Sequence, residues 1–318
     1  MNDFPRILFY GTPSIAVASL ERLLDEKFNV AAVVTAPDKP AGRGLKLTVS
    51  PVKEFALSRA LPVLQPISMK DPGFQAELRA LAPDLQVVVA FRMMPKEVWA
   101  LPPLGTFNLH ASLLPQYRGA APINWAIING ETETGVTTFF LEERTDTGRI
   151  IFAEKTRIGP EETAGELHDR LMDLGAVLVV KTVRAIAAGP VRPIPQQELI
   201  SGGTTLKPAP KFSRDDARID WSLDHREVFN HIRGMSPYPG AFTEIPMNDG
   251  SLLNLKIFRA VPEAVPGTLA GSGFQTDRRS WLKIPATDGY LLLQEVQPAG
   301  RRIMKISEFL NGFGKLIS

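Results

Sequence analysis

Apolar runs that alternate with amphipathic stretches are the feature that most constrains the fold of this chain. Four such runs occupy residues 6–11, 29–37, 85–91 and 106–110. The first two lack the regular polar and apolar alternation of a strand with one wet face, which is typical of strands buried on both faces. Helical patterns at 51–60 and 74–82 lie between the runs. This order predicts an α/β domain with a Rossmann-like, open and mostly parallel sheet, whose ligand site lies at the carboxyl ends of the strands.

The residue composition and the hydrophobic pattern change twice in the later part of the chain, which predicts a second domain. Residues 190–210 contain five prolines and two adjacent glycines without periodicity, the composition of a partly extended linker. Short strand patterns separated by Gly and Pro turns follow, and they favour a small OB-like β-barrel. A length of 318 residues also exceeds one typical domain of roughly 100–200 residues. We therefore expect an N-terminal α/β domain over 1–189, a Pro-rich linker over 190–210 and a C-terminal β-barrel domain over 211–318.

Composition excludes several kinds of site. The chain has no cysteine, so disulfides, thiol nucleophiles and Cys-ligated zinc or iron–sulfur clusters are ruled out. Its four histidines show no paired ligand spacing, and we expect no metal. A formal net charge of +2 is far from the positive excess that by itself indicates nucleic-acid binding, which leaves the partner open. No apolar stretch approaches the roughly 18 residues of a spanning helix, so we expect a cytoplasmic protein without membrane attachment.

The turn after the first strand argues against a nucleotide site. It reads Gly11-Thr12-Pro13-Ser14 rather than G-x-G-x-x-G. Pro13 removes one of the backbone N–H donors that would hold a pyrophosphate. The Walker spacing G-x-x-x-x-G-K-[ST] is absent as well. We expect neither NAD(P) nor a P-loop nucleotide here.

Polar side chains gather where the last parallel strand of the predicted sheet ends. Asn108 and His110 are two residues apart in that strand, so they project from the same face at its carboxyl end. Asp146 lies in a Thr-Asp-Thr-Gly turn between two extended runs, from which a carboxylate could reach the sheet end. The plainer interpretation is that His110 satisfies a buried carbonyl, Asn108 caps a turn and Asp146 bonds its own backbone.

The segment that contains these three residues resembles a known signature. NLHASLLPQYRGAAPINWAIINGETETGVTTFFLEERTDTG (108–148) is similar to the motif of the 10-formyltetrahydrofolate-dependent formyltransferases. The resemblance implies that Asn108, His110 and Asp146 are the catalytic residues and act on the formyl group. It also implies that 10-formyltetrahydrofolate is the formyl donor and co-substrate. The residues implied to line the folate site are Ser112, Leu113, Leu114 and Pro115.

Three further regions resemble the branch of this family that formylates methionyl-tRNA, and they extend the similarity over nearly the whole chain. They are YGTPSIAVASLERLL (10–24), APDKPAGRGLKLTVSPVKEFAL (36–57), and KPAPKFSRDDARIDW (207–221) with GMSPYPGAFT (234–243). The branch implies initiator methionyl-tRNA as the acceptor, a role in translation initiation, and a C-terminal domain that binds tRNA. We expect a monomer. An enzyme that formylates an amino-sugar nucleotide is the alternative, because it would use the same three residues.

Two regions bear on the details of this resemblance. Lys39, Arg43 and Lys46, with two glycines, form a basic loop that would contact phosphates near the tRNA acceptor end, although a solvated surface loop has the same composition. After the fourth core strand the chain reads Phe91-Arg92-Met93-Met94-Pro95, where the family usually has an aromatic residue followed by glycine. In the family this segment belongs to the pterin pocket, so the resemblance does not define the details of that pocket here.

Overall fold

The computed structural model describes residues 4–41, 46–200, 202–203, 205–265, 267, 269 and 273–317. The chain forms two compact units, neither of which is a single stretch of sequence. The first unit comprises Met1–Gly119, Thr134–Thr156 and His168–Pro208. The second comprises Ala120–Glu133, Arg157–Leu167 and Ala209–Ser318.

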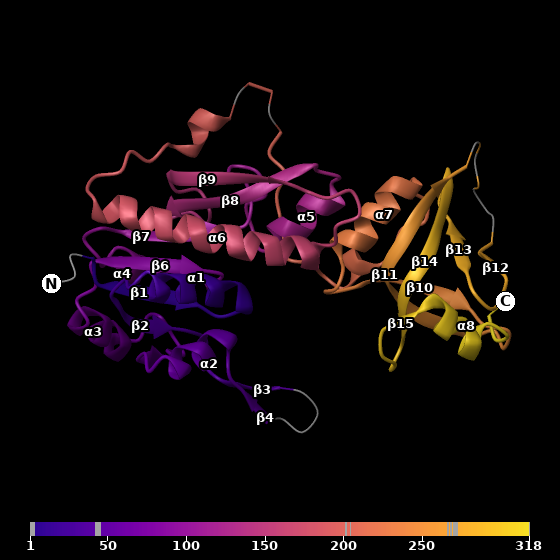
Figure 1. The fold of residues 1–318 in the computed structure, drawn as a ribbon, viewed down its shortest axis with the longest axis horizontal. Coiled ribbons are helices and arrows are strands. Elements are labelled where there is room, and N and C mark those ends of the chain that lie inside the picture. Colours follow the sequence, from indigo (N-terminus) through magenta and orange to yellow (C-terminus); the bar gives the residue numbers. More distant parts are fainter. Residues whose placement is uncertain are drawn as a thin grey trace. The chain divides into compact units, whose positions relative to one another are not determined.

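A seven-stranded sheet, in the order β5-β2-β1-β6-β7-β8-β9, is the framework of the first unit (Figure 1). The strands are β1 Ile7–Gly11, β2 Val30–Val34, β5 Val63–Leu64, β6 Leu85–Val89, β7 Thr106–His110, β8 Glu133–Phe140 and β9 Ile150–Arg157. β1 pairs in parallel with β2 and β6, β2 with β5, and β6 with β7, whereas β8 runs antiparallel to β7. The predicted Rossmann-like, mostly parallel sheet is therefore confirmed.

The helices of the first unit are α1 Ser14–Asp25, α2 Pro51–Ser58, α3 Pro72–Ala80 and α4 Lys96–Trp99, together with the long α6 Ala164–Ala187 that starts outside this unit. Side chains cap the starts of α2 and α3. Ser50 accepts the Lys53 N–H at 3.1 Å before α2, and Asp71 accepts the Phe74 N–H at 2.8 Å before α3. Each cap is followed by proline, which suits a first helical turn. None of the described helices has the length and apolar character needed to cross a membrane.

The helix α6 packs against β7 and β8. Thr182 Oγ1 lies 2.9 Å from Thr138 Oγ1 of β8. A Cβ added to Gly175 would lie 2.7 Å from Leu109 Cδ2 of β7, so glycine permits this close approach. One face of β7 is thereby covered by α6.

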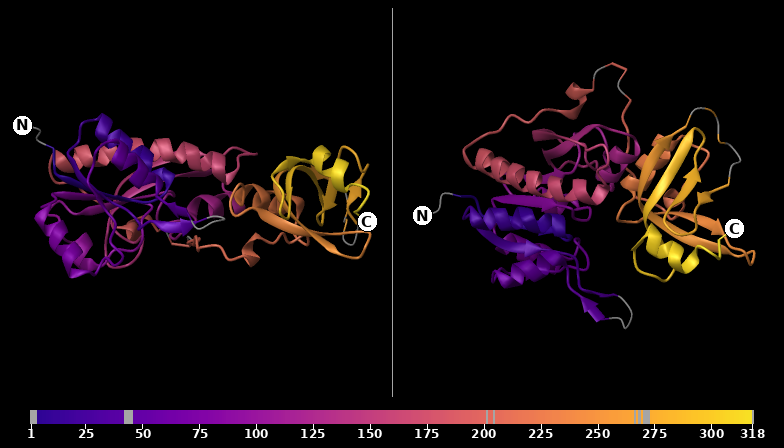
Figure 2. Two further views of the ribbon diagram at one scale, coloured as in Figure 1. Left: turned by 90° about the horizontal axis from the view of Figure 1, so that it is seen from below. Right: turned by 45° about the vertical axis from the view of Figure 1, so that its right-hand side comes forward.

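Proline-rich residues 190–208 lie within the first unit. Ile194 forms a β-bridge with Ile150, and the Lys207 carbonyl accepts the Tyr117 N–H at 2.7 Å. Residues 190–200 run as an extended chain that ends in one short 3₁₀ turn, η1 Gln196–Leu199 (Figure 2). These contacts tie the segment predicted to be a linker to the sheet that carries β7.

The second unit is built on a curled antiparallel sheet in the order β10-β11-β14-β13-β12, with β15 paired to β14. Its elements are α5 Pro122–Ile128, η2 Asp215–Ala217, α7 His225–Gly234, β10 Ala241–Pro246, β11 Leu252–Ala264, β12 Gln275–Thr276, β13 Leu282–Pro285, β14 Gly289–Pro298, β15 Met304–Lys305 and α8 Ile306–Phe313. Buried side chains from α7, the sheet and α8 fill its core, among them Ile232, Leu255, Leu291 and Phe309. The prediction of a small β-barrel is confirmed in the form of a curled half-barrel sheet.

The helix α5 belongs to the second unit although it follows directly on the β7 loop in sequence. Asn124 Nδ2 donates to the Gly234 carbonyl at 2.7 Å, and Trp125 Nε1 donates to the Pro210 carbonyl at 2.9 Å. The Trp125 ring also stacks on Phe212 with 4.9 Å between centroids. The sequence patterns predict neither α5 nor β10 and α8.

The β8–β9 connection tests how tightly the framework is packed. A Cβ at Gly148 would lie 1.7 Å from the Phe140 carbonyl oxygen, a backbone atom that cannot rotate away. We expect Gly148→Ala to lower the free energy of unfolding by about 1–3 kcal/mol, measured by urea denaturation. Gly202→Ala is the matched control, because nothing lies within 4 Å of the added methyl group. Equal stabilities of the two variants would contradict this packing.

Candidate active site

Asn108 and His110 project from the face of β7 opposite α6. The Leu109 side chain between them packs against α6 at Gly175, and neighbouring side chains of a strand point to opposite faces. In the register, Asn108 is paired with Val88 of β6 and with Phe139 of β8. The predicted placement of both residues on one face at the carboxyl end of β7 is what the structure has.

The His110 ring is buried, with 6% of its surface exposed, and one nitrogen is already bonded. Its Nε2 lies 2.8 Å from the Tyr117 carbonyl oxygen. Because a carbonyl oxygen only accepts, Nε2 carries a proton. The plainer interpretation of His110 is thus correct for Nε2. Among the described residues no hydrogen bond is found for Nδ1, which is the nitrogen left for chemistry.

Asn108 has a buried side-chain atom without a partner. Its Oδ1 is shielded from solvent and makes no hydrogen bond to any described residue. Buried polar groups in proteins are almost always paired, and exceptions gather at functional sites. Rotation of the amide exchanges Oδ1 and Nδ2, so this position suits either a donor or an acceptor on a ligand.

The Asp146 carboxylate reaches across to another loop. Its Oδ2 accepts the Gly119 N–H at 3.1 Å. The residue has φ +53°, in the left-handed region that few non-glycine residues adopt. The plainer interpretation, in which Asp146 bonds its own turn, is therefore wrong for Oδ2. No hydrogen bond to Oδ1 is found among the described residues.

The loop Tyr117–Gly119 connects His110 with Asp146. His110 bonds its first carbonyl, and Asp146 bonds its last N–H. The Arg118 side chain between these contacts is partly buried, and burial lowers the pKa of Arg118, while the negative charge of Asp146 opposes that shift. His110 and Asp146 are thereby held at the end of the sheet where β7 also places Asn108. No three His, Cys, Asp or Glu side chains of the described chain are grouped as metal ligands.

The segment predicted to line a folate site, Ser112–Pro115, is fixed by a residue that the sequence did not reveal. Thr137 Oγ1 of β8 donates to the Ser112 carbonyl at 2.6 Å and accepts the Leu114 N–H at 3.2 Å. The Ser112 hydroxyl donates to the Gln116 carbonyl at 2.7 Å, so it is engaged within the loop. Leu114 and Pro115 are buried, whereas Leu113 is partly exposed. The backbone at this segment is rigidly placed beside His110.

The predicted basic loop forms a short hairpin, in which β3 Lys39–Ala41 pairs with β4 Lys46–Thr48. Lys39 is exposed, and of Lys46 only the backbone is described. Arg43 lies outside the described residues. At the base of the hairpin Asp38 pairs with Lys53 at 2.5 Å, and this hydrogen bond is the main cause of the lowered pKa of Asp38.

The segment Phe91–Pro95, where the chain departs from the family pattern, is anchored to a neighbouring loop. Arg92 donates to the Pro66 carbonyl and, at 2.9 Å, to the Ile67 carbonyl. The Phe91 ring contacts the Tyr10 ring edge-on, with 5.5 Å between centroids. The Tyr10 hydroxyl is buried, and this burial raises the pKa of Tyr10.

Two family models match the chain. Residues 5–183 match the model of the formyl transferase family, and residues 211–314 match the model of the formyl transferase C-terminal domain. This chain belongs to the formyl transferase family. Among similar proteins of this family, a methionyl-tRNA formyltransferase of Parabacteroides distasonis is 49% identical over 312 residues, which cover 98% of this chain and 96% of that protein.

Solved structures of formyl transferase relatives share the fold. HypX from Aquifex aeolicus in complex with tetrahydrofolic acid matches with a TM-score of 0.65 at 19% identity, over 98% of this chain and 47% of that one. An N-formyltransferase from Helicobacter canadensis, in complex with folinic acid and dTDP-3-aminofucose, matches with a TM-score of 0.64 at 22% identity, over 92% of this chain and 99% of that one. At such identities the similarity establishes the fold.

Replacing Thr137 tests how the Ser112–Pro115 segment is held. Thr137→Val keeps the side-chain shape but removes both hydrogen bonds to buried backbone groups. We expect a free energy of unfolding lower by about 1–3 kcal/mol, together with a raised KM for a formyl-folate donor. Thr137→Ser retains the hydroxyl and should stay close to wild type in both measurements. Wild-type behaviour of Thr137→Val would show that the hydroxyl does not hold the segment.

Proposed function

We propose that this chain transfers the formyl group of 10-formyltetrahydrofolate to the α-amino group of initiator methionyl-tRNA. Residues 1–189 carry catalysis, 190–210 link the domains and 211–318 bind tRNA. The observation that carries the proposal is the buried, unpartnered Asn108 Oδ1 on the same face of β7 as His110, in a chain 49% identical to a methionyl-tRNA formyltransferase over nearly its full length. The protein would work in the cytoplasm as a monomer.

The transfer requires groups that stabilise negative charge on the formyl oxygen as the amine attacks. Asn108 donates from its amide, and His110 donates from Nδ1. Because Nε2 already holds a proton on the Tyr117 carbonyl, only the doubly protonated ring donates from Nδ1. One such donor typically contributes about 10²–10³ in rate. His110 must therefore be charged in this role.

Asp146 supports this chemistry in one of two ways. Its Oδ2 is held by the Gly119 N–H, while Oδ1 can accept the proton that leaves the amine, directly or through water. That proton then passes to the folate nitrogen as its bond to the formyl carbon breaks, which releases tetrahydrofolate. Alternatively its negative charge favours and orients the charged His110 ring. Both roles need an ionised carboxylate at the position that the turn gives it.

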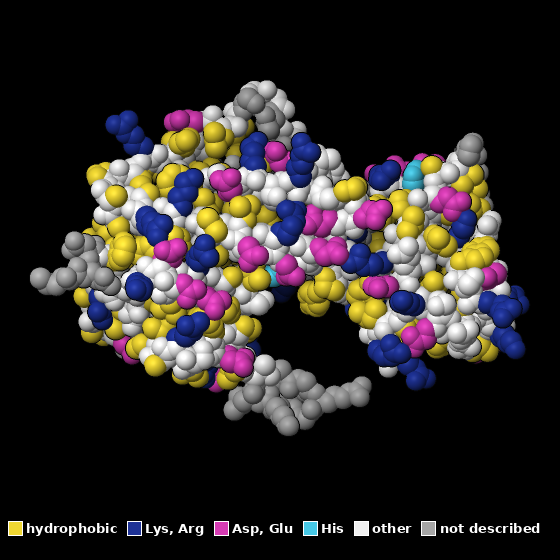
Figure 3. Space-filling view, viewed as in Figure 1, with side chains coloured by type: hydrophobic (Ala, Val, Ile, Leu, Met, Phe, Trp, Pro, Cys, Tyr) yellow, Lys and Arg dark blue, Asp and Glu magenta, His cyan; other side chains and the backbone are white. Residues whose placement is uncertain are grey.

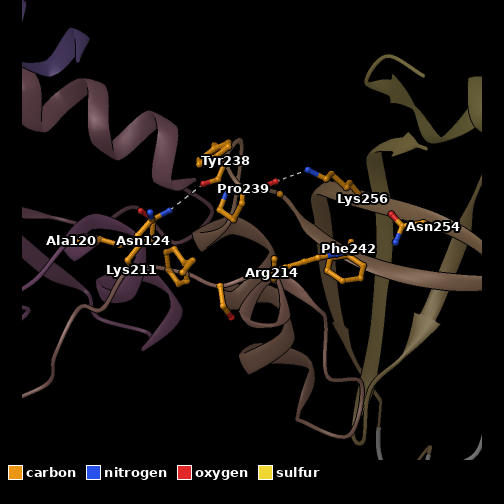
Figure 4. Close-up of a pocket in the computed structure, with 14 residues that line it drawn as sticks. Ala120, Asn124, Lys211, Arg214, Tyr238, Pro239, Phe242, Asn254 and Lys256 are labelled. Atoms are coloured by element: carbon orange, nitrogen blue, oxygen red, sulfur yellow. Dashed lines mark hydrogen bonds between the residues drawn. The ribbon is translucent and has the colours of Figure 1, made fainter. Parts of the chain in front are cut away.

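The second unit contains a cavity with the chemistry that single-stranded nucleic acid prefers (Figure 4). Its volume is about 580 Å³, and its lining includes the cations Lys211, Arg214 and Lys256 with the rings of Phe212 and Phe242. Lys256 donates to the Pro239 carbonyl at 2.7 Å. Neither Lys211 nor Arg214 forms an ion pair with another described residue. Cations bind phosphates and aromatic rings stack on bases.

The 49% identity to a methionyl-tRNA formyltransferase favours a tRNA acceptor over an amino-sugar nucleotide, and the cavity suits the phosphates and bases of tRNA. Over the face drawn in Figure 3, basic and acidic side chains are mixed rather than gathered in one field. The cavity of the second unit, in contrast, has three cations and no acidic side chain in its lining. The amino-sugar alternative remains open to test through the acceptor used in the assay.

The role of Asp146 is tested by Asp146→Asn, which keeps the size of the side chain and tolerates a positive φ. We expect formylation of methionyl-tRNA to fall by at least about 10²-fold, because the side chain loses its charge and its proton-accepting capacity. Folate binding and the thermal midpoint should be unchanged. Near wild-type turnover would refute the proposed role.

The role of the cavity is tested by Lys211→Ala combined with Arg214→Ala. We expect a raised KM for methionyl-tRNA and a salt dependence of binding that is weaker by about one unit of log–log slope for each cation removed. The KM for the folate donor should not change. Lys315→Ala, which removes an exposed cation of the same unit, is the control. An equal effect of all variants would argue against a specific RNA contact in the cavity.

A further inference from the structure

Gln196 is a polar residue in the proline-rich segment whose side chain is completely buried, with 0% of its surface exposed. It lies at the start of η1, between the two ranges that match the family models. A buried amide is costly unless all its groups are paired. The hydrogen bonds of the Gln196 side chain therefore indicate its structural role.

The Gln196 amide nitrogen donates both of its hydrogens to the turn that contains Asp146. Nε2 donates to the Asp146 carbonyl at 2.9 Å and to the Gly148 carbonyl at 2.8 Å. The amide thus bonds the turn on both sides of Thr147. Left-handed backbone is unfavourable for a non-glycine residue and persists where the surroundings enforce it. The two bonds from Gln196 hold the backbone of the turn in which Asp146 has a φ of +53°.

The oxygen of the same amide accepts hydrogen bonds from Arg118. Oε1 accepts from Arg118 Nε at 3.0 Å and from Arg118 Nη2 at 2.6 Å. A guanidinium often uses this pair of donors to form a bidentate hydrogen bond with a carboxylate. The Arg118 charge is close enough to Asp146 for their attraction to act on the pKa of Arg118, yet among the described residues the two side chains form no ion pair. Gln196 turns the guanidinium fork away from the carboxylate.

We propose that Gln196 is a positioning residue for formyl transfer: it holds the Asp146 turn and keeps Arg118 from pairing with the Asp146 carboxylate. The inference rests on the proposed role of Asp146. Its consequence is that Oδ1 of Asp146 stays available for the reaction. Without Gln196, Arg118 would pair with Asp146, and the pairing would hold the carboxylate ionised and occupied.

The first test compares Gln196→Met, which keeps the length of the side chain without its polar groups, with Gln197→Met. Gln197 is exposed in the same η1 turn and is the matched control. We expect Gln196→Met to lower kcat by about 10- to 100-fold, with both KM values within about threefold of wild type. Because Arg118 then pairs with Asp146, the acid limb of the kcat profile should move to lower pH. A wild-type kcat, or a loss that merely follows the unfolded fraction, would overturn the inference.

A double-mutant cycle separates this inference from the proposed function. If Gln196 acts through Asp146, then Gln196→Met adds little to the loss already caused by Asp146→Asn. Fully additive losses would overturn the positioning role. Retained turnover in Asp146→Asn alone would instead overturn the proposed function, whatever Gln196→Met does.

A second variant keeps the test decisive if Gln196→Met folds poorly. Gln196→Glu retains an oxygen for Arg118 but presents a second oxygen to the Asp146 and Gly148 carbonyls, where hydrogens are needed. We expect a loss of kcat of the same order, because the turn loses both hydrogen bonds while Arg118 stays held. A wild-type kcat in Gln196→Glu would show that the hydrogen bonds to the turn are dispensable.

Discussion

The site depends on one stretch of backbone, Tyr117–Gly119, that is held from both sides. His110 donates to the first carbonyl of this stretch, and Asp146 accepts from its last N–H. The first contact fixes which nitrogen of His110 carries a proton in the neutral ring, and the second fixes one oxygen of Asp146. The atoms that remain, Nδ1 of His110 and Oδ1 of Asp146, define what the site can do. A catalytic constellation of this kind gains its rate from preorganisation, because no group must reorient as charge develops.

The parallel sheet could be predicted from the sequence because its strands are buried on both faces and read as uninterrupted apolar runs, as in Ile7–Gly11. The same logic placed Asn108 and His110 on one face, since strand geometry has a period of two. Helix α5 escaped prediction because it is short and follows a stretch rich in turn residues. It is stabilised by distant partners at Pro210 and Gly234 rather than by its own propensity.

The residues that hold the site were less accessible to sequence reasoning than the residues that act in it. Thr137 and Gln196 reach their partners across 25 and 50 positions of the chain. Contacts over such separations leave no periodicity or motif spacing in the sequence from which they could be predicted. A glutamine in a proline-rich stretch reads as solvated linker, yet its side chain is buried and fully bonded. Net charge was uninformative for the same reason: a value of +2 describes the whole chain, whereas the cations proposed to contact tRNA line one cavity of the second unit.

The central claim is that Asn108 and His110 hold the formyl oxygen while Asp146 faces the attacking amine. A crystal structure of this chain with a non-transferable 10-formylfolate analogue tests it most directly. The account predicts the formyl oxygen within about 2.7–3.2 Å of the Asn108 amide and of His110 Nδ1, with Oδ1 of Asp146 facing the formyl carbon. A formyl group out of hydrogen-bond reach of both Asn108 and His110 would contradict it.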